Sequence, residues 1–188
     1  MTTSRFISFL TALSFSLSAV PALAMDGAMH MTKKGVMVGG SLMVQNLDIV
    51  DNAVKAKNVT TVVAAVKAAG LVETLKSAGP FTVFAPVNSA FDRLPKGTVQ
   101  TLLKPENKEK LTSILTYHVV PGRYTAKDLK NGLTLTTVQG DTLKVKRLGM
   151  NIWINNARVS IRDVISSNGV THVINTVLLP PMKVEAAM

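Results

Sequence analysis

The side chains of this sequence that could serve as acid, base or metal ligand near neutral pH are three histidines, His30, His118 and His172. Together with Asp163 and a serine of the pair Ser166-Ser167, His172 supplies the residue types of a Ser-His-Asp hydrolase. The patterns that present such groups are absent: the sequence has no Gly-x-Ser-x-Gly elbow, no pair of histidines at helical spacing for zinc, and no Gly-rich phosphate loop followed by Lys-Ser or Lys-Thr. The few carboxylates are scattered, so no pair of acids marks a general acid–base site. We therefore predict that the protein is not an enzyme and has no catalytic residue, no cofactor and no metal site.

The composition indicates a folded, basic domain rather than a disordered tail. The 188 residues include 21 Lys and Arg against 11 Asp and Glu, a formal charge of +10, yet 47% are hydrophobic and only 17% are charged. This length suits one domain with a short appendage. Because the sequence has no cysteine, disulfides, thiolate metal cages and cysteine nucleophiles are excluded.

Residues 1–24 have the pattern of a signal peptide. Arg5 precedes an apolar stretch at 6–20, and Ala22-Leu23-Ala24 is the small-x-small pattern that signal peptidase accepts. Serines interrupt the stretch, which is shorter than the ~20 apolar residues that span a bilayer, so we expect cleavage rather than anchoring. The mature protein is therefore predicted to be secreted or periplasmic, with no transmembrane segment. There it meets acidic polysaccharide, envelope lipid and cell-surface protein rather than nucleic acid.

Residues 25–45 are rich in methionine and glycine and show little periodicity, which predicts a flexible arm. Met25, Met29, His30 and Met31 are soft and imidazole ligands of the kind that bind a cuprous ion. Nothing in the pattern fixes their geometry, so we favour a solvated start of the mature protein over a copper site. A short tail is expected at 182–188.

Hydrophobic periodicity places helices mainly in the first half of the chain and strands mainly in the second. Helices are expected at 49–54, 60–69, 71–75, 97–103 and 106–115. Strands are expected at 81–84, 117–120, 133–138, 142–148, 151–155, 157–163 and 170–175. This order favours an α+β fold with a mainly antiparallel sheet over alternating βαβ units, in a single domain at 46–181.

Five side chains mark a candidate binding surface. Alternation along the strands at 142–148, 151–155 and 157–163 points apolar residues inward. If these strands are neighbours, one outward face holds Lys144, Lys146, Trp153, Arg158 and Arg162. Guanidinium forks and a flat ring suit an acidic glycan or a lipid headgroup. A solvated basic face that discourages aggregation is the alternative.

Three ordered blocks stand out in the second half of the sequence and just before it. They are Thr82-Val83-Phe84-Ala85-Pro86-Val87-Asn88-Ser89-Ala90-Phe91, then Tyr117-His118, then Asn168-Gly169-Val170-Thr171-His172-Val173-Ile174-Asn175 with Val177-Leu178-Leu179-Pro180. These blocks resemble the signature motifs of the fasciclin (FAS1) domain family, over essentially residues 48–180. Val87, Ser89 and Asn175 depart from the residues usual in the family, which bears on local hydrogen bonds and not on the fold.

The resemblance implies a β-wedge or sandwich with several helices packed on it, and a role in cell adhesion or extracellular matrix interaction. In adhesive members an Asp-Ile pair before the last block, helped by the Tyr-His element, resembles a receptor-recognition motif; the matching residues are Asp163-Val164 and Tyr117-His118. A carboxylate that closes a strand also accepts turn amides, which is the structural interpretation of Asp163. His172 shares a strand side with Val170 and Ile174, so a neutral imidazole bonded to backbone is favoured over a ligand.

We therefore predict an exported, non-catalytic binding and adhesion module. Its candidate partner-binding residues are Lys144, Lys146, Trp153, Arg158, Arg162, Asp163, Tyr117 and His118. The alternative, also suggested by the family, is a carrier of an apolar ligand such as a carotenoid or lipid. Its groove would be lined by residues such as Leu133, Leu135 and Ile152.

Overall fold

The computed structural model of the protein describes residues 35–181. The predicted signal peptide at 1–24, the first part of the arm at 25–34 and the tail at 182–188 lie outside these residues. The candidate copper ligands Met25, Met29, His30 and Met31 lie outside them as well. The described residues thus comprise the predicted domain and the part of the arm next to it.

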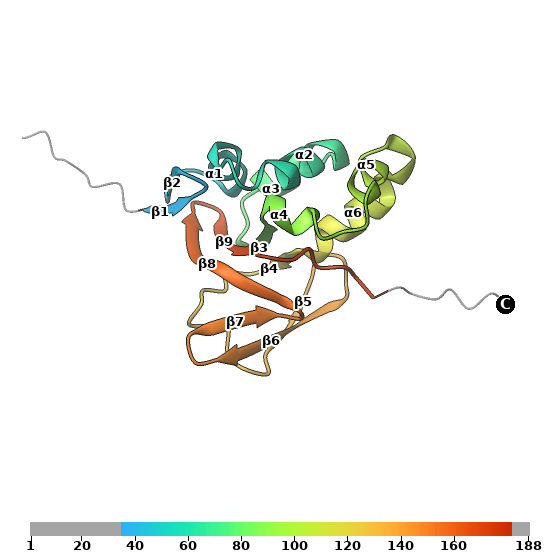
Figure 1. The fold of residues 1–188 in the computed structure, drawn as a ribbon. Coiled ribbons are helices and arrows are strands. Elements are labelled where there is room, and N and C mark those ends of the chain that lie inside the picture. Colours follow the sequence, from blue (N-terminus) through green and yellow to red (C-terminus); the bar gives the residue numbers. More distant parts are fainter. Residues whose placement is uncertain (1–34, 182–188) are drawn as a thin grey trace, which may run out of the picture. The chain divides into compact units, whose positions relative to one another are not determined.

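Seven strands form one mixed sheet in the order β4-β3-β9-β8-β7-β6-β5 (Figure 1). Their bounds are Phe81–Pro86 (β3), Val119–Pro121 (β4), Thr134–Thr136 (β5), Thr142–Leu148 (β6), Asn151–Ile154 (β7), Ala157–Ser166 (β8) and Gly169–Ile174 (β9). Only β3 and β9 pair in parallel; the other neighbours are antiparallel. The predictions of an α+β fold and of a mainly antiparallel sheet are confirmed.

The helices gather on one side of β3 and β9, and β5, β6 and β7 lie on the other side (Figure 1). The helices are Ile49–Lys55 (α1), Thr60–Ala69 (α2), Val72–Lys76 (α3), Asn88–Phe91 (α4), Thr98–Leu102 (α5) and Lys108–Tyr117 (α6), with a 3-10 turn at Pro105–Asn107. Their apolar faces cover the sheet, as the 3.6-residue periodicity predicts.

Strand β9 separates two apolar clusters and is buried along its whole length. Val173 belongs to the cluster beneath the helices, together with Leu111 and Leu115 of α6. The next residue, Ile174, belongs to the cluster that includes Ile154 of β7. Consecutive strand residues point to opposite faces, so the helices bury one face of β9 and the distant strands bury the other.

The parallel pairing of β3 with β9 requires glycine at one end. Phe81 is paired with Gly169, and a Cβ atom on Gly169 would collide with the backbone carbonyl oxygen of Phe81. A larger residue would therefore push the two strands apart. Asn168 holds the same corner: its Nδ2 donates to the carbonyl of Leu75 at 2.7 Å and its Oδ1 accepts from the amide of Ile49 at 3.0 Å. This corner joins the last strand to the first helices.

Residues 35–44 form a hairpin of β1 (Gly35–Val38) and β2 (Ser41–Val44), so the prediction of a flexible arm is wrong for this part. Val38 and Met43 are buried in the cluster beneath the helices. Gly39 and Gly40 have positive φ values of 56° and 79°, as a tight hairpin turn requires. The Gly-Gly dipeptide is itself a hairpin indicator, but the short strands around it give little alternation to support it.

One buried side chain ties the hairpin to α1. The Nδ2 of Asn52 donates to the carbonyl of Val44 at 2.8 Å, and its Oδ1 accepts from the amide of Val44 at 3.0 Å. The same Nδ2 donates to Ser166 Oγ of β8 at 3.0 Å. Because a carboxamide carries both groups of a peptide bond, Asn52 continues the hydrogen bonding of the hairpin into the domain.

We expect Asn52→Ala to lower the free energy of unfolding by about 2–4 kcal/mol, because it leaves the amide and carbonyl of Val44 without their partner. Urea denaturation measures this change. The matched control Asn156→Ala, at an exposed position between β7 and β8, is expected to change stability by less than about 0.5 kcal/mol. Equal stability of the two variants would contradict the role given to Asn52.

Candidate functional site

Four of the five predicted outward side chains of β6, β7 and β8 form one surface. Along β6 exposed and buried residues alternate, with Lys144 and Lys146 exposed, as the sequence predicts. Lys146 is paired with Trp153 of β7, and Trp153 is paired in turn with Arg158 of β8. The predicted adjacency of these strands is therefore confirmed. We call the surface formed by Lys144, Lys146, Trp153 and Arg158 the basic face.

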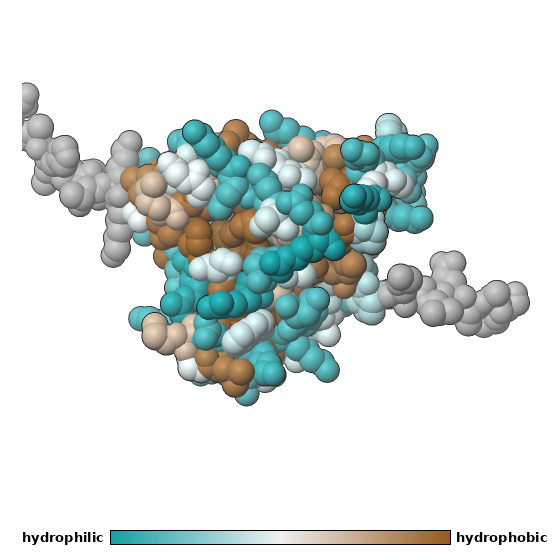
Figure 2. All heavy atoms as spheres, viewed as in Figure 1, coloured by the Kyte–Doolittle hydropathy of each residue, from teal (hydrophilic) through white to brown (hydrophobic). Residues whose placement is uncertain are grey.

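The basic face carries uncompensated positive charge. The segment 142–162 contains five Lys and Arg residues and no Asp or Glu. Among residues 35–181 the ion pairs involve only Lys76 and Lys104, so no carboxylate lies within 4.0 Å of a cation on this face. Hydrophilic atoms cover much of the part of the molecule formed by these strands, with a group of hydrophobic atoms at its lower edge (Figure 2).

Arg162 does not extend this row, because two register shifts interrupt the alternation of β8. Its Nη1 donates instead to the carbonyl of Met150 in the β6–β7 turn, at 3.1 Å. A β-bulge redirects side chains in this way, and sequence alternation cannot locate one. Arg147 comes close to the same turn, where its Nε donates to the carbonyl of Gly149 at 3.3 Å. Alternation places Arg147 on the inward side of β6, so the sequence interpretation missed it.

Asp163 acts on the backbone of a neighbouring loop. It has a positive φ of 57°, and its Oδ1 accepts from the amide of Ala126 at 2.7 Å. The structural interpretation of this carboxylate, as an acceptor of turn amides, agrees with this geometry. Val164, the second residue of the receptor-contact hypothesis, is buried in the cluster beneath the helices.

Tyr117 and His118 lie at the end of α6 and not on a strand, so the predicted strand at 117–120 begins too early. Both side chains are buried, with 2% and 3% of their surface exposed. The Tyr117 hydroxyl donates to the carbonyl of Thr142 at 3.1 Å and accepts from Asn155 Nδ2 at 3.0 Å. The hypothesis that these two residues contact a partner directly is wrong, because the helix turns them into the interior.

Two buried imidazoles each bond one backbone carbonyl and one backbone amide. His118 Nε2 accepts from the amide of Leu178 at 3.0 Å, so its Nδ1 carries the proton donated to the carbonyl of Ile114 at 2.8 Å. His172 has the opposite tautomer: Nδ1 accepts from the amide of Asp163 at 3.3 Å, and Nε2 donates to the carbonyl of Tyr124 at 2.9 Å. With both ring nitrogens used, neither imidazole is free to act as a base.

Burial also opposes protonation of both rings. It lowers the pKa of His118 from 6.5 to about 4, although the bond to Ile114 acts in the opposite direction. Burial lowers the pKa of His172 as well, against the bond to Tyr124 and the charge of Asp163. The His172 ring is fully buried and stacks on Phe84, with ring centroids 5.7 Å apart. The expectation of a neutral, backbone-bonded His172 is confirmed.

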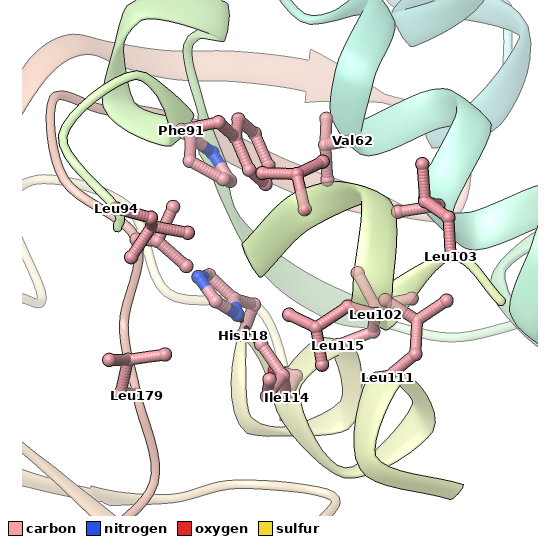
Figure 3. Close-up of a pocket in the computed structure, with 14 residues that line it drawn as sticks. Val62, Phe91, Leu94, Leu102, Leu103, Leu111, Ile114, Leu115, His118 and Leu179 are labelled. Carbon is pink, nitrogen blue, oxygen red and sulfur yellow. Dashed lines mark hydrogen bonds between the residues drawn. The ribbon is translucent and has the colours of Figure 1, made fainter. Parts of the chain in front are cut away.

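Apolar cavities exist, but they are small and do not lie where the carrier alternative expects them. One of about 30 Å³ is bounded by Phe91, Leu115, Leu179 and the edge of the His118 ring (Figure 3). A second, of about 50 Å³, lies between α1, α2, α3 and β3. Pockets for small organic ligands usually occupy about 300–1,000 Å³, so neither cavity holds such a ligand as it stands.

The predicted ligand groove at Leu133, Leu135 and Ile152 is filled by protein. Leu135 and Ile152 are 2% and 1% exposed and belong to the cluster on the far side of β9, against which Leu133 packs. Alternation correctly predicts that these side chains point inward, but the other residues of the cluster pack against them and leave no groove. In residues 35–181 no group of three or more His, Cys, Asp or Glu side chains is placed to hold a metal, and no helix is both long and apolar enough to cross a bilayer.

Comparison with known proteins gives consistent matches. The sequence model of the family described as "Fasciclin domain" matches residues 57–180. Protein sll1483 of Synechocystis sp. is 46% identical over 181 residues, which make up 96% of this chain and 99% of that protein. Cell surface glycolipoprotein MPB83 of Mycobacterium bovis is 40% identical over 111 residues, 59% of this chain and 48% of that protein.

A solved structure shows the same fold. It is the FAS1 domain pair from the insect cell adhesion molecule Fasciclin I, which aligns with a TM-score of 0.66 at 19% identity. The alignment covers 78% of this chain and 58% of that chain. The β-wedge fold expected from the sequence resemblance is thereby confirmed.

The buried histidines predict a pH dependence of stability. Below pH 6.5 the unfolded chain binds a proton at His118 that the folded protein does not bind until about pH 4, so the free energy of unfolding should fall across this window as the pH is lowered. In His118→Gln the fall should be shallower, with the remainder due to His172. Denaturant unfolding at several pH values measures both profiles, and parallel profiles would contradict the assignment.

Proposed function

The chain belongs to the fasciclin domain family, and from that premise we propose that it is an exported, non-catalytic adhesion module whose basic face binds acidic polysaccharide of a cell surface or extracellular matrix. Fasciclin domains are generally non-catalytic. The side chains best suited to acid–base catalysis, His118 and His172, use their ring nitrogens for hydrogen bonds to the backbone. Binding through the surface is the function that remains available.

The observation that carries this proposal is the continuous row from Lys146 through Trp153 to Arg158. Neighbouring strands lie about 4.8 Å apart, so the row spans about 10 Å, comparable with two linked sugar rings. Trp153 is a half-buried indole between two cations. Sugar rings stack on such rings, and the flanking cations suit carboxylate or sulfate groups.

The rigidity of the row favours binding. Leu143, Val145, Ile152 and Ile154 anchor β6 and β7 from beneath with 0–3% of their surface exposed. Side chains that project from a packed sheet lose less freedom on binding than side chains on a loop, so less of the interaction energy is lost to ordering. A row of charges on a fixed sheet also suits an extended polymer better than a compact ligand.

Export rests on two independent supports. Residues 1–24 have the charge, apolar stretch and small-x-small ending of a signal peptide. The names of the relatives place one at a cell surface and identify another as a cell adhesion molecule. An exported basic protein meets acidic polysaccharide before it meets nucleic acid, which agrees with the chemistry of the basic face.

We expect the purified protein to bind alginate, a polymer of uronic acids, and to release it as the ionic strength rises. Lys146→Glu and Arg158→Glu should each weaken binding about tenfold, because each places a like charge against the carboxylates. Titration calorimetry at low and high salt measures the affinity and its salt dependence.

Lys110→Glu is the matched control, because Lys110 is an exposed lysine on α6, away from the basic face, and its reversal changes the net charge equally. This variant should bind almost as the wild type does. If Lys110→Glu weakens binding as much as Arg158→Glu, only net charge matters and the assignment to the basic face fails. Absence of salt-sensitive binding to any acidic polysaccharide would refute the proposed function itself.

A further inference from the structure

Two arginines next to the β6–β7 turn are held in place by neutral backbone groups and not by carboxylates. Arg147 Nη1 donates to the carbonyl of Ala126 at 2.8 Å, in addition to the bond from its Nε to Gly149. Arg162 Nη1 donates to the carbonyl of Met150 at 3.1 Å. A carbonyl orients a guanidinium without cancelling its charge, and each group keeps more donors than these bonds use. Such an arginine is prepared to receive an anion.

Both arginines line the same open basin on the surface. The basin has a volume of about 540 Å³ and is also bordered by Lys127, Ser160 and Asp163. Its three cations and one carboxylate give a local charge of 3 − 1 = +2. Ser160 is exposed, so its hydroxyl is available as a further donor.

The bulges of β8 and a single hydrogen bond produce this arrangement. Register shifts on both sides of Ile161 turn Arg162 and Asp163 toward the loop that carries Ala126 and Lys127. The Asp163 carboxylate accepts a hydrogen bond from the amide of Ala126 at 2.7 Å, which holds that loop against β8. The loop then supplies both the carbonyl that orients Arg147 and the ammonium group of Lys127.

We infer that this basin is a binding site for a tetrahedral oxyanion, a phosphate monoester or a sulfate ester. Two guanidinium forks match the oxygens of a tetrahedral oxyanion, and a local charge of +2 attracts a phosphate monoester or a sulfate ester. The basin is separate from the basic face, because none of Lys144, Lys146, Trp153 and Arg158 borders it. The basin would bind a single anionic group, whereas the basic face would bind several successive groups of an extended polymer.

Such a group could belong to a lipid headgroup or to a polysaccharide, and the exposed apolar side chains of the β6–β7 turn distinguish these two sources. Leu148 and Met150 lie at the β6–β7 turn and are 56% and 75% exposed. Beside a phosphorylated lipid headgroup these side chains would enter the apolar layer of the membrane, which favours binding in proportion to the buried apolar area. Beside a sulfated polysaccharide they have no apolar phase to enter. The oxyanion chemistry is the same in both cases.

The test is a titration of inorganic phosphate and of sulfate into the isotope-labelled protein, followed by NMR amide shifts at constant ionic strength. We expect saturable shifts at Lys127, Arg147 and residues 160–163. Arg147→Gln and Arg162→Gln should each weaken binding about tenfold. The matched control Arg158→Gln, an arginine on the basic face, should leave phosphate binding unchanged. Lys127→Gln is a second test that disturbs no backbone bond of the two arginines.

Shifts that do not saturate, or that appear equally with chloride, would overturn the inference as an adventitious ion only. The assignment to the basin also fails if Arg158→Gln and Arg162→Gln weaken phosphate binding equally. These outcomes are distinct from failure of the proposed function, which is measured with alginate and with Lys146→Glu and Arg158→Glu. Loss of alginate binding in those variants with intact phosphate binding separates the two sites.

Vesicles of phosphatidylcholine with and without phosphatidic acid, compared with heparin, identify the source. For a lipid source, the pair of changes Leu148→Ser and Met150→Ser should abolish vesicle binding and leave inorganic phosphate binding intact. For a polysaccharide source, the same pair should leave heparin binding unchanged, while Arg162→Gln reduces it about tenfold, both measured in an Arg158→Glu background in which binding at the basic face is weakened. Met37→Ser, which removes another exposed methionine on the β1–β2 hairpin, is the control for a general loss of apolar surface. If neither vesicle binding nor heparin binding changes when Arg147 or Arg162 is replaced, the role of the basin is overturned.

Discussion

The rest of the structure depends on the burial of β9 on both faces and on its parallel pairing with β3. A strand without a solvent face must satisfy every polar group from within the protein. His172 on this strand does so by joining two separate backbone segments, at Tyr124 and Asp163. His118 does the same between α6 and Leu178, just beyond the strand. Both buried imidazoles therefore hold the scaffold together.

This constraint decides where chemistry can occur. A buried histidine that is fixed as a neutral tautomer by one amide and one carbonyl cannot exchange protons with a substrate without breaking the fold's own bonds. The charges of the basic face lie on β6 and β8, on either side of Trp153 of β7, where the outer face of the sheet meets solvent. The same bulged strand, β8, contributes Arg158 to the basic face and Arg162 to the basin, so two different surfaces share one element.

Sequence patterns predict the local elements well and the long-range ones poorly. The alternation of β6 and β7 is visible because one face is buried, and it locates Lys144, Lys146 and Trp153 correctly. Periodicity misses the β1–β2 hairpin because the order of this hairpin comes from Asn52, a contact that no periodicity records. Tyr and Val favour strands, so the sequence predicts a strand from residue 117, whereas packing of α6 extends the helix through Tyr117. The basin could not be predicted, since it needs the bulges of β8 and a loop 37 residues away along the chain.

The central claim is that the interior is scaffold and that partners bind the outer surface of β6 to β8. The most direct measurement is an NMR shift map with a short acidic oligosaccharide, because the single Trp153 supplies one indole N–H resonance that reports on the basic face alone. The account predicts that this resonance and the amides of β6, β7 and the start of β8 move together and saturate. An unmoved indole, with the largest shifts at 114–118 and 177–179 around the apolar cavity, would contradict it.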